Sequence, residues 1–200
     1  MNTKFLGDAF DHWKGSLISF LSINRLVKNV VVEPMITNDS KWSKEDLETY
    51  SRLLKLESSS QICHGQSTFS GDRETYFDAL PKNADIFLDP DIGIATSTAG
   101  KKRVRVAELE KLLVNADRVL IVYQHSARGF FYKRLIQIGD RISRDIPNVH
   151  YAVYECGRVA VFFISLNKAR IEELFNFLLF IACCFYYLRF FYNDRHSIKV

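Results

Sequence analysis

The loop Asp89-Pro90-Asp91-Ile92-Gly93 has the residue types that bind ligands at the end of a strand. It follows the apolar run 84–88, which predicts a buried strand. Its two carboxylates, with a stiff proline between them, could accept hydrogen bonds from an amine or bind a divalent metal through oxygen. Gly93 would allow a ligand to approach the backbone closely. The alternative is a strand-to-helix turn in which aspartate caps backbone amides.

Two further apolar runs also end in polar residues. Run 29–34 reaches Glu33, and run 118–125 ends in Gln124 and His125. Glu33 could face a ligand, or it could be a solvated or capping acid. His125 could act as an acid or a base, because histidine side chains exchange protons near neutral pH, or it could simply cap the strand. The carboxyl ends of parallel strands share one edge of a sheet, so we expect Glu33, Asp89 and Gln124 to lie on a common rim.

Helical patterns separate these strands. Two helices are predicted in the first part of the chain, at 8–21 with Asp8 as N-cap and from Ser43 to residue 54. Three more are predicted further on: one that includes Leu112, one at 127–143 with Phe130 and Ile136 inward, and one that begins at Lys168. The runs 150–155 and 159–165 predict a β-hairpin. Strands that alternate with helices favour parallel pairing. We therefore predict one α/β domain over residues 1–200, with a doubly wound, mostly parallel sheet closed by an antiparallel hairpin. That architecture resembles the methyltransferase fold, which is one of the Rossmann-like folds.

The bulk composition is that of an ordinary globular protein. Of the 200 residues, 48% are hydrophobic and 25% are charged, which excludes the disordered and fibrous classes. The net charge of +4 is compatible with an anionic partner but does not indicate one. The four cysteines lack C-x-x-C spacing, which excludes the usual zinc patterns and a disulfide framework. The polar start does not resemble a secretory signal, so we expect a cytoplasmic protein.

The segment 174–192 is strongly apolar. Its first fifteen residues, 174–188, carry no charge, but about 20 residues are needed to span a bilayer. We therefore predict no stable membrane span. The segment is expected to pack on the core as a helix or as a helix followed by a strand. The alternative is that it binds a partner or dimerises.

Three segments resemble the ribosomal-RNA adenine methyltransferases of the J type. The run from Gly7 to Lys14 is similar to the amino-terminal segment of that family, and 88–91 is similar to its catalytic Asp-Pro-Pro-Tyr loop. The run 154–161 is similar to its closing hairpin. The resemblance implies S-adenosylmethionine as methyl donor and adenine in RNA as acceptor.

The resemblance also assigns roles to individual residues. Lys14 would help to hold the cofactor, and we group Asp11 and Glu33 with it as candidate cofactor-binding residues. Asp89 would accept a hydrogen bond from the adenine amine, while Pro90 fixes the loop. The chain departs from the family where Asp91 and Ile92 replace the second Pro and the Tyr, and where no glycine follows the first strand.

Three hypotheses of function follow. The first is a methyltransferase-like enzyme that acts on nucleic acid, with Asp89, Pro90, Asp91 and His125 as catalytic residues and no metal ligand. The second is a metal-dependent nuclease or hydrolase with Asp89, Asp91 and Glu33 as oxygen ligands. The third is a non-catalytic interaction protein on the same fold, which leaves open whether the chain is an enzyme. The basic cluster Lys101, Lys102 and Arg103, with Arg105 nearby, could bind the phosphates of a nucleic acid, or it could be a solvated charge run.

Overall fold

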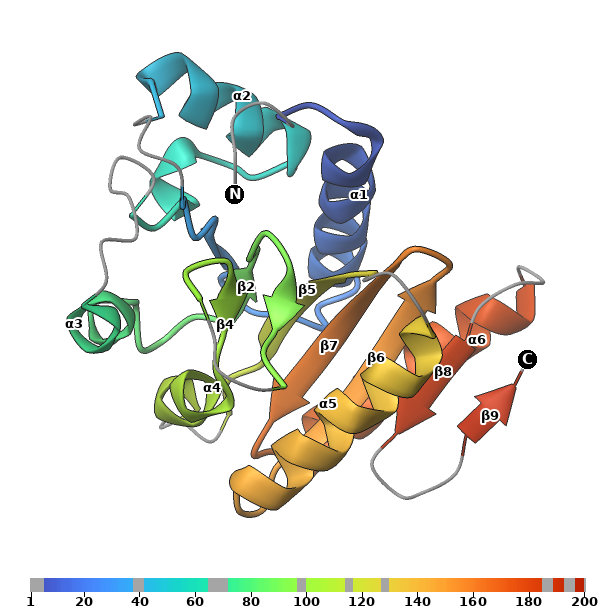
Figure 1. The fold of residues 1–200 in the computed structure, drawn as a ribbon. Helices are drawn as coiled ribbons and strands as arrows, with labels where there is room; N and C mark the ends of the chain where they lie inside the picture. Colours follow the sequence, from blue (N-terminus) through green and yellow to red (C-terminus); the bar gives the residue numbers. More distant parts are fainter. Residues whose placement is uncertain are drawn as a thin grey trace.

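The computed structural model of this chain describes residues 6–37, 42–64, 72–96, 100–113, 117–126, 130–184, 189–192 and 197–199, with side chains up to residue 180. It is a mixed α/β fold, as predicted, with helices on both faces of a central sheet (Figure 1). Asp39, which follows the first strand in the sequence, lies outside the described residues, and so does segment 185–188.

The described strands of the main sheet lie in the order β1-β2-β5-β7-β6-β8-β9. Their bounds are Val31–Glu33 for β1, Ile86–Leu88 for β2, Leu120–His125 for β5, His150–Cys156 for β6, Val159–Ser165 for β7, Arg189–Tyr192 for β8 and Ser197–Lys199 for β9. A second, small sheet pairs β3, Gly93–Ile94, with β4, Arg103–Val104, where the sequence predicted only a loop.

The main sheet has a parallel half and an antiparallel half. Strands β1, β2 and β5 are parallel neighbours, and the predicted hairpin β6–β7 joins them through an antiparallel β5–β7 pairing. Strands β8 and β9 then extend the sheet beyond β6, again antiparallel. The prediction of a mostly parallel sheet therefore describes only the half that carries the Asp89 loop.

Local sequence signals explain where the first helices begin. The described helices are α1, Ala9–Ile23; α2, Lys44–Leu53; α3, Arg73–Asp78; α4, Val106–Leu112; α5, Phe131–Asp145; and α6, Lys168–Cys184, with a 3-10 turn at Ser59–Gln61. The Asp8 side chain accepts from the backbone amides of Phe10 and Asp11, as an N-cap does. Ser43 and Asp46 form a capping box at the predicted start of α2.

The sheet separates two hydrophobic cores, because side chains alternate between its faces. Val32, Phe87 and Ile121 pack with residues of α1, α2 and α6 on one face. On the other face, Ile86, Leu88, Leu120 and Val122 pack with residues of α3, α4 and α5. We call these the α1 face and the α5 face. Figure 1 shows α5 in front of the antiparallel strands.

Helix α5 corrects one prediction. Leu135, Ile138 and Ile142 form its buried stripe, but Ile136 is 42% exposed because it lies outside this stripe. Phe130 is 88% exposed, because it is the N-cap residue and its side chain precedes the first helical turn.

The apolar segment near the carboxyl end forms part of α6 and strand β8. Leu174, Phe175 and Leu178 are buried against the α1 face, whereas Phe180 is 69% exposed. Strand β8 pairs with β6. Among the helices that the structure describes, none is both long enough and apolar enough to span a membrane.

Candidate functional site

The register of the three parallel strands divides the predicted rim between the two faces. Glu33 pairs with Leu88, and Leu88 pairs with Val122, so these residues point to the same face. Gln124, two residues beyond Val122, also points to the α5 face. Asp89 follows Leu88 by one residue and points to the α1 face, as His125 does. The strand ends meet as predicted, but Glu33 and Gln124 do not face Asp89.

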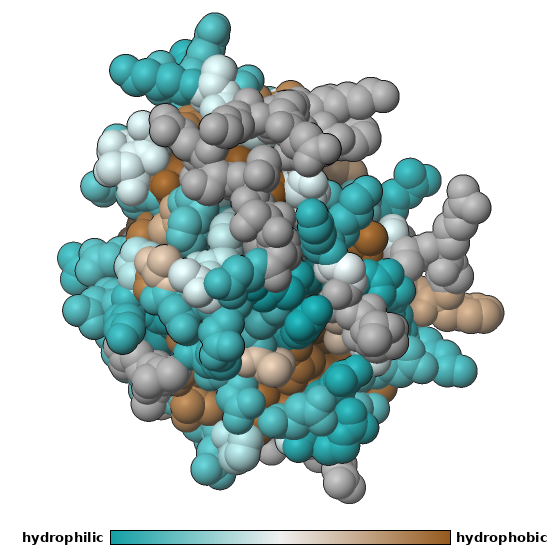
Figure 2. Space-filling model, turned by 60° about the vertical axis from the view of Figure 1, so that its left-hand side comes forward, coloured by the Kyte–Doolittle hydropathy of each residue, from teal (hydrophilic) through white to brown (hydrophobic). Residues whose placement is uncertain are grey.

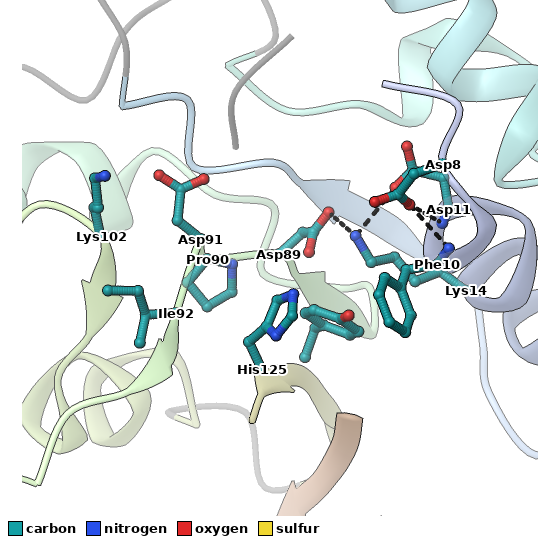
Figure 3. Close-up of a pocket in the computed structure, with 11 residues that line it drawn as sticks. Asp8, Phe10, Asp11, Lys14, Asp89, Pro90, Asp91, Ile92, Lys102 and His125 are labelled. Atoms are coloured by element: carbon teal, nitrogen blue, oxygen red, sulfur yellow. Dashed lines mark hydrogen bonds and ion pairs between the residues drawn. The ribbon is translucent and has the colours of Figure 1, made fainter. Parts of the chain in front are cut away.

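A pocket of about 420 Å³ opens on the α1 side of this rim. It combines residues from the start of α1, the loop after β2, the residue before β4 and the end of β5. Figure 3 shows Asp89 between Lys14 and His125, with Asp91 and Lys102 on the far side. The lining residues are Asp8, Phe10, Asp11, Lys14, Asp89, Pro90, Asp91, Ile92, Lys102, Tyr123 and His125.

A buried ion pair fixes Asp89 at the pocket. The Lys14 Nζ lies 2.7 Å from Asp89 Oδ2 and 3.1 Å from Asp11 Oδ1. The Tyr50 hydroxyl, on α2, donates to the same Asp89 oxygen at 2.6 Å. Lys14 is only 5% exposed and Asp89 only 2%, so both charges are shielded from solvent. Two neighbours contact the Lys14 ammonium. Asp11 lies one turn earlier on the same helix, and the centroid of the Tyr123 ring lies 4.3 Å from Nζ.

The protonation states of this cluster follow from burial and charge. Burial by itself would lower the pKa of Lys14, but Asp89 and Asp11 outweigh it, so the pKa lies above its usual value and Lys14 stays charged. Burial raises the pKa of Asp11 in spite of the opposing effect of Lys14. Burial, with Asp89 adding to it, raises the pKa of Tyr50 well above its usual range. Tyr50 therefore remains a phenol that donates its proton to Asp89.

Aromatic side chains form one wall of the pocket. The Phe10 and His125 rings meet edge to face with centroids 5.5 Å apart, and Tyr123 meets His125 in the same manner at 5.9 Å. Trp13, one residue before Lys14, is half-buried and stacks on Tyr154 at 5.8 Å. Phe10, Tyr50 and Tyr123 were not among the predicted site residues. Phe10 and Tyr123 flank predicted positions in the sequence, whereas nothing in the helical pattern of residues 44–54 singled out Tyr50.

Glu33 does not face a ligand, which corrects its prediction as a cofactor-binding or metal-binding carboxylate. It is fully buried, and its Oε1 accepts from the Met35 amide at 2.8 Å and from the Tyr76 hydroxyl. The His64 Nδ1 lies 2.8 Å from its Oε2. Its partners on the α5 face therefore fully engage this carboxylate, because the register points it away from Asp89.

Gln124 and Asp91 hold the loop around the pocket. The Gln124 Oε1 accepts from the Ile94 amide at 2.8 Å, and its Nε2 donates to the carbonyl of Ile92 at 2.9 Å. A Cβ on Gly93 would lie 2.2 Å from the Gln124 amide, so the glycine is needed for this close approach rather than for a ligand. Asp91 lines the pocket and accepts from the Thr37 hydroxyl at 2.6 Å.

The predicted basic cluster is only partly at the site. Lys101 and Lys102 are exposed and Arg103 is half-buried. Lys102 lines the pocket, and its carbonyl accepts from the Ile92 amide at 3.0 Å. Arg103 lies in β4, so the cluster continues from the pocket mouth onto the neighbouring surface.

Within the described ranges, no three His, Cys, Asp or Glu side chains are grouped to hold a metal ion. Asp89 is paired with Lys14, Asp91 with Thr37, and Glu33 with Tyr76 and His64 on the opposite face. The three acids predicted as oxygen ligands therefore do not converge.

The end of β1 does not fit S-adenosylmethionine in the ordinary Rossmann-like mode. That mode uses a glycine-rich turn after the first strand, so that the backbone can approach the cofactor. Here residues 34–37 contain no glycine, and Met35 and Ile36 are buried at 0% and 1% exposure. Because Glu33 is also engaged internally, this edge offers the cofactor neither an open turn nor a free acceptor.

No protein-family model, no curated protein and no solved structure matches this chain.

Proposed function

We propose that this chain is a methyltransferase-like protein that binds an amine-bearing base of a nucleic acid, with adenine preferred, in the pocket at Asp89. The observation that carries the proposal is the position of the Asp89 carboxylate. Lys14 and Tyr50 both bond to its Oδ2, and among the described residues no hydrogen bond is donated to Oδ1. Oδ1 is therefore available to accept from a ligand amine.

The charge of the pocket favours a ligand that donates hydrogen bonds. Four aspartates and two lysines line it, so its interior is acidic although the whole chain is basic. A phosphate in this interior would meet several carboxylates, whereas an exocyclic amine would find acceptors. The Phe10 and His125 rings supply the flat apolar contact that a heteroaromatic base needs.

Each residue of the cluster has a distinct part in the proposal. Asp89 accepts the hydrogen bond from the amine, while the ion pair with Lys14 and the hydrogen bond from Tyr50 fix the orientation of its carboxylate. The resemblance around Asp89 supports adenine as the preferred base. We propose no methyl-transfer step, because the end of β1 does not fit the donor in the ordinary mode.

Nucleoside titrations test the proposal. The three nucleosides differ at position 6 of the purine. Adenosine has an amine there that can donate to Asp89, purine riboside has only a hydrogen atom, and inosine has a carbonyl that Asp89 would repel. We expect isothermal titration calorimetry to show adenosine binding about tenfold more tightly than purine riboside, with inosine weakest. Asp89→Asn should reverse the order of adenosine and inosine, because an amide can donate to the inosine carbonyl.

The matched control is Asp140→Asn, an exposed aspartate on α5 across the sheet from the pocket. It should leave all three affinities unchanged. Equal affinities for adenosine and inosine in the unmodified protein, or an unchanged preference in Asp89→Asn, would contradict the proposal. Calorimetry with S-adenosylmethionine in the same series shows whether the pocket takes that ligand instead.

A further inference from the structure

The hydroxyl of Tyr123 is a buried polar group in the wall of the Asp89 pocket. Tyr123 lines this pocket and is only 3% exposed, and its hydroxyl has no hydrogen-bond partner among the described residues. A buried hydroxyl without a partner is unfavourable, because nothing replaces the hydrogen bonds that it makes to water in the unfolded chain. In the wall of a pocket, such a group indicates a partner on the ligand.

Tyr123 lies beside the buried ion pair. It belongs to β5 and points to the α1 face, as Asp89 does, and the Lys14 Nζ that bonds to Asp89 lies 4.3 Å from the centroid of its ring. Burial raises the pKa of this phenol, and the charges of Asp89, Asp8 and Asp11 raise it further. These three carboxylates line the same pocket. The hydroxyl is therefore close enough to feel their charge, although it bonds to none of them.

The wall that contains Tyr123 also provides apolar contact. Its ring meets the His125 ring edge to face with centroids 5.9 Å apart, and Phe10 meets the same histidine at 5.5 Å. The side of the molecule that carries α3 and α4 is instead largely hydrophilic (Figure 2). A flat base therefore finds aromatic contact in the pocket rather than on that side. Because Tyr123 belongs to the same wall, a base held against these rings lies next to it.

The hydroxyl and Asp89 together require two kinds of atom in a ligand. The raised pKa keeps Tyr123 a phenol at neutral pH, so its hydroxyl can donate. The Asp89 Oδ1 can accept, because the bonds from Lys14 and Tyr50 both go to Oδ2. A ligand that contacts both groups must carry a hydrogen-bond acceptor close to a donor. Adenine has this arrangement, since the ring nitrogens N1 and N7 lie on either side of its exocyclic amine.

We propose that the Tyr123 hydroxyl donates to the adenine ring nitrogen beside the exocyclic amine while Asp89 accepts from that amine. The inference rests on the proposed function and deepens it, because it makes Tyr123 a residue that determines specificity. An amine without a neighbouring acceptor would satisfy Asp89 but leave the Tyr123 hydroxyl unpaired. The pocket should therefore bind a simple amine less tightly than it binds an adenine edge.

Analogues that lack one ring nitrogen test the inference. Calorimetry should compare adenosine with 1-deazaadenosine and 7-deazaadenosine, in each of which a C–H group replaces one nitrogen. We expect one of the two analogues to bind the unmodified protein about tenfold more weakly than adenosine. Tyr123→Phe should weaken adenosine binding about tenfold as well. It should cause no further loss for that analogue, because both changes remove the same hydrogen bond.

Two readouts separate this contact from a structural role. Tyr123→Phe keeps the ring against Lys14 and removes only the unpaired hydroxyl, so the melting temperature should stay the same or rise. The matched control is Tyr151→Phe, which removes a hydroxyl that bonds to Ser143 on the α5 face. It should leave the affinities for all three nucleosides unchanged.

Equal affinities of the three nucleosides for the unmodified protein would overturn the inference, and so would an equal loss for all three in Tyr123→Phe. If Tyr123→Phe has no effect while Asp89→Asn still reverses the order of adenosine and inosine, this inference alone is wrong. If the ring-nitrogen dependence is present but Asp89→Asn leaves that order unchanged, the proposed function alone is wrong. A protein that binds none of the nucleosides would contradict both.

Discussion

At the scale of single residues, the buried ammonium of Lys14 joins three parts of the chain at the pocket. It contacts Asp11 on its own helix and Asp89 after β2, and Asp89 in turn accepts from Tyr50 on α2. Removing one partner of a buried ion pair typically costs 3–5 kcal/mol, since the other charge is left uncompensated, which is about the range we expect for Asp89→Ala. The cluster therefore couples the stability of the fold to the geometry of the pocket.

Tyr50→Phe should show this coupling through its pH dependence. In the unfolded chain tyrosine ionises near about pH 10, but burial and Asp89 raise the pKa of Tyr50 in the fold. A raised pKa gives stability that is present below the unfolded value and is lost as pH rises above it. At pH near 8 the variant should be less stable by about 1.5–3 kcal/mol through loss of the hydrogen bond to a charged group.

The measurement is urea unfolding of both proteins at neutral and at alkaline pH. Because only the unmodified protein has the Tyr50 titration, the difference in the free energy of unfolding should shrink above about pH 10. A difference that stayed constant or grew with pH would show that the Tyr50 hydroxyl is not buried against Asp89.

At the scale of elements, the close contact of α1 and α2 positions Tyr50 over Asp89. A Cβ on Gly15 would lie 1.9 Å from the carbonyl oxygen of Leu53, which is backbone and cannot move aside cheaply. The helices can approach this closely only because position 15 has no side chain. Gly15 follows Lys14, so one turn of α1 both positions the Lys14 ammonium and allows α2 to pack closely against α1.

Gly15→Ala should therefore destabilise the protein by about 1–3 kcal/mol, through overpacking, although alanine is the better helix former. Displacing α2 should also weaken adenosine binding. Gly100→Ala is the control, because its Cβ would meet nothing within 4 Å, and it should change stability by less than about 0.5 kcal/mol. Thermal unfolding and calorimetry check both effects. A stabilised Gly15→Ala variant would mean that the helices are further apart.

The sequence predicted the elements better than it predicted the site. Apolar runs and capping residues located β1, β2, β5, the β6–β7 hairpin and the starts of α1 and α2. The register between strands could not be predicted from the sequence alone. Glu33 pairs with Leu88 rather than with Asp89, so Glu33 points to the α5 face and Asp89 to the α1 face. Tyr50 reaches Asp89 through a contact 39 residues apart, which no local pattern encodes.

At the scale of the whole molecule, the sheet separates two environments at its carboxyl edge. On the α1 face, Asp89 lines an acidic pocket, while on the α5 face Glu33 is closed off by Tyr76 and His64. Lys102 lines the pocket and is followed by Arg103 in β4. The carboxyl edge of the sheet therefore carries an acidic pocket on one face and an internally bonded carboxylate on the other.

A crystal structure of the protein with bound adenosine tests the central claim most directly. We expect the base to lie against the Phe10 and His125 rings, with its exocyclic amine within about 3 Å of an Asp89 carboxylate oxygen and with Glu33 still bonded to Tyr76 and His64. Adenosine bound at the end of β1, with Glu33 turned out to its ribose, would contradict the account, because the first strand would then hold the ligand.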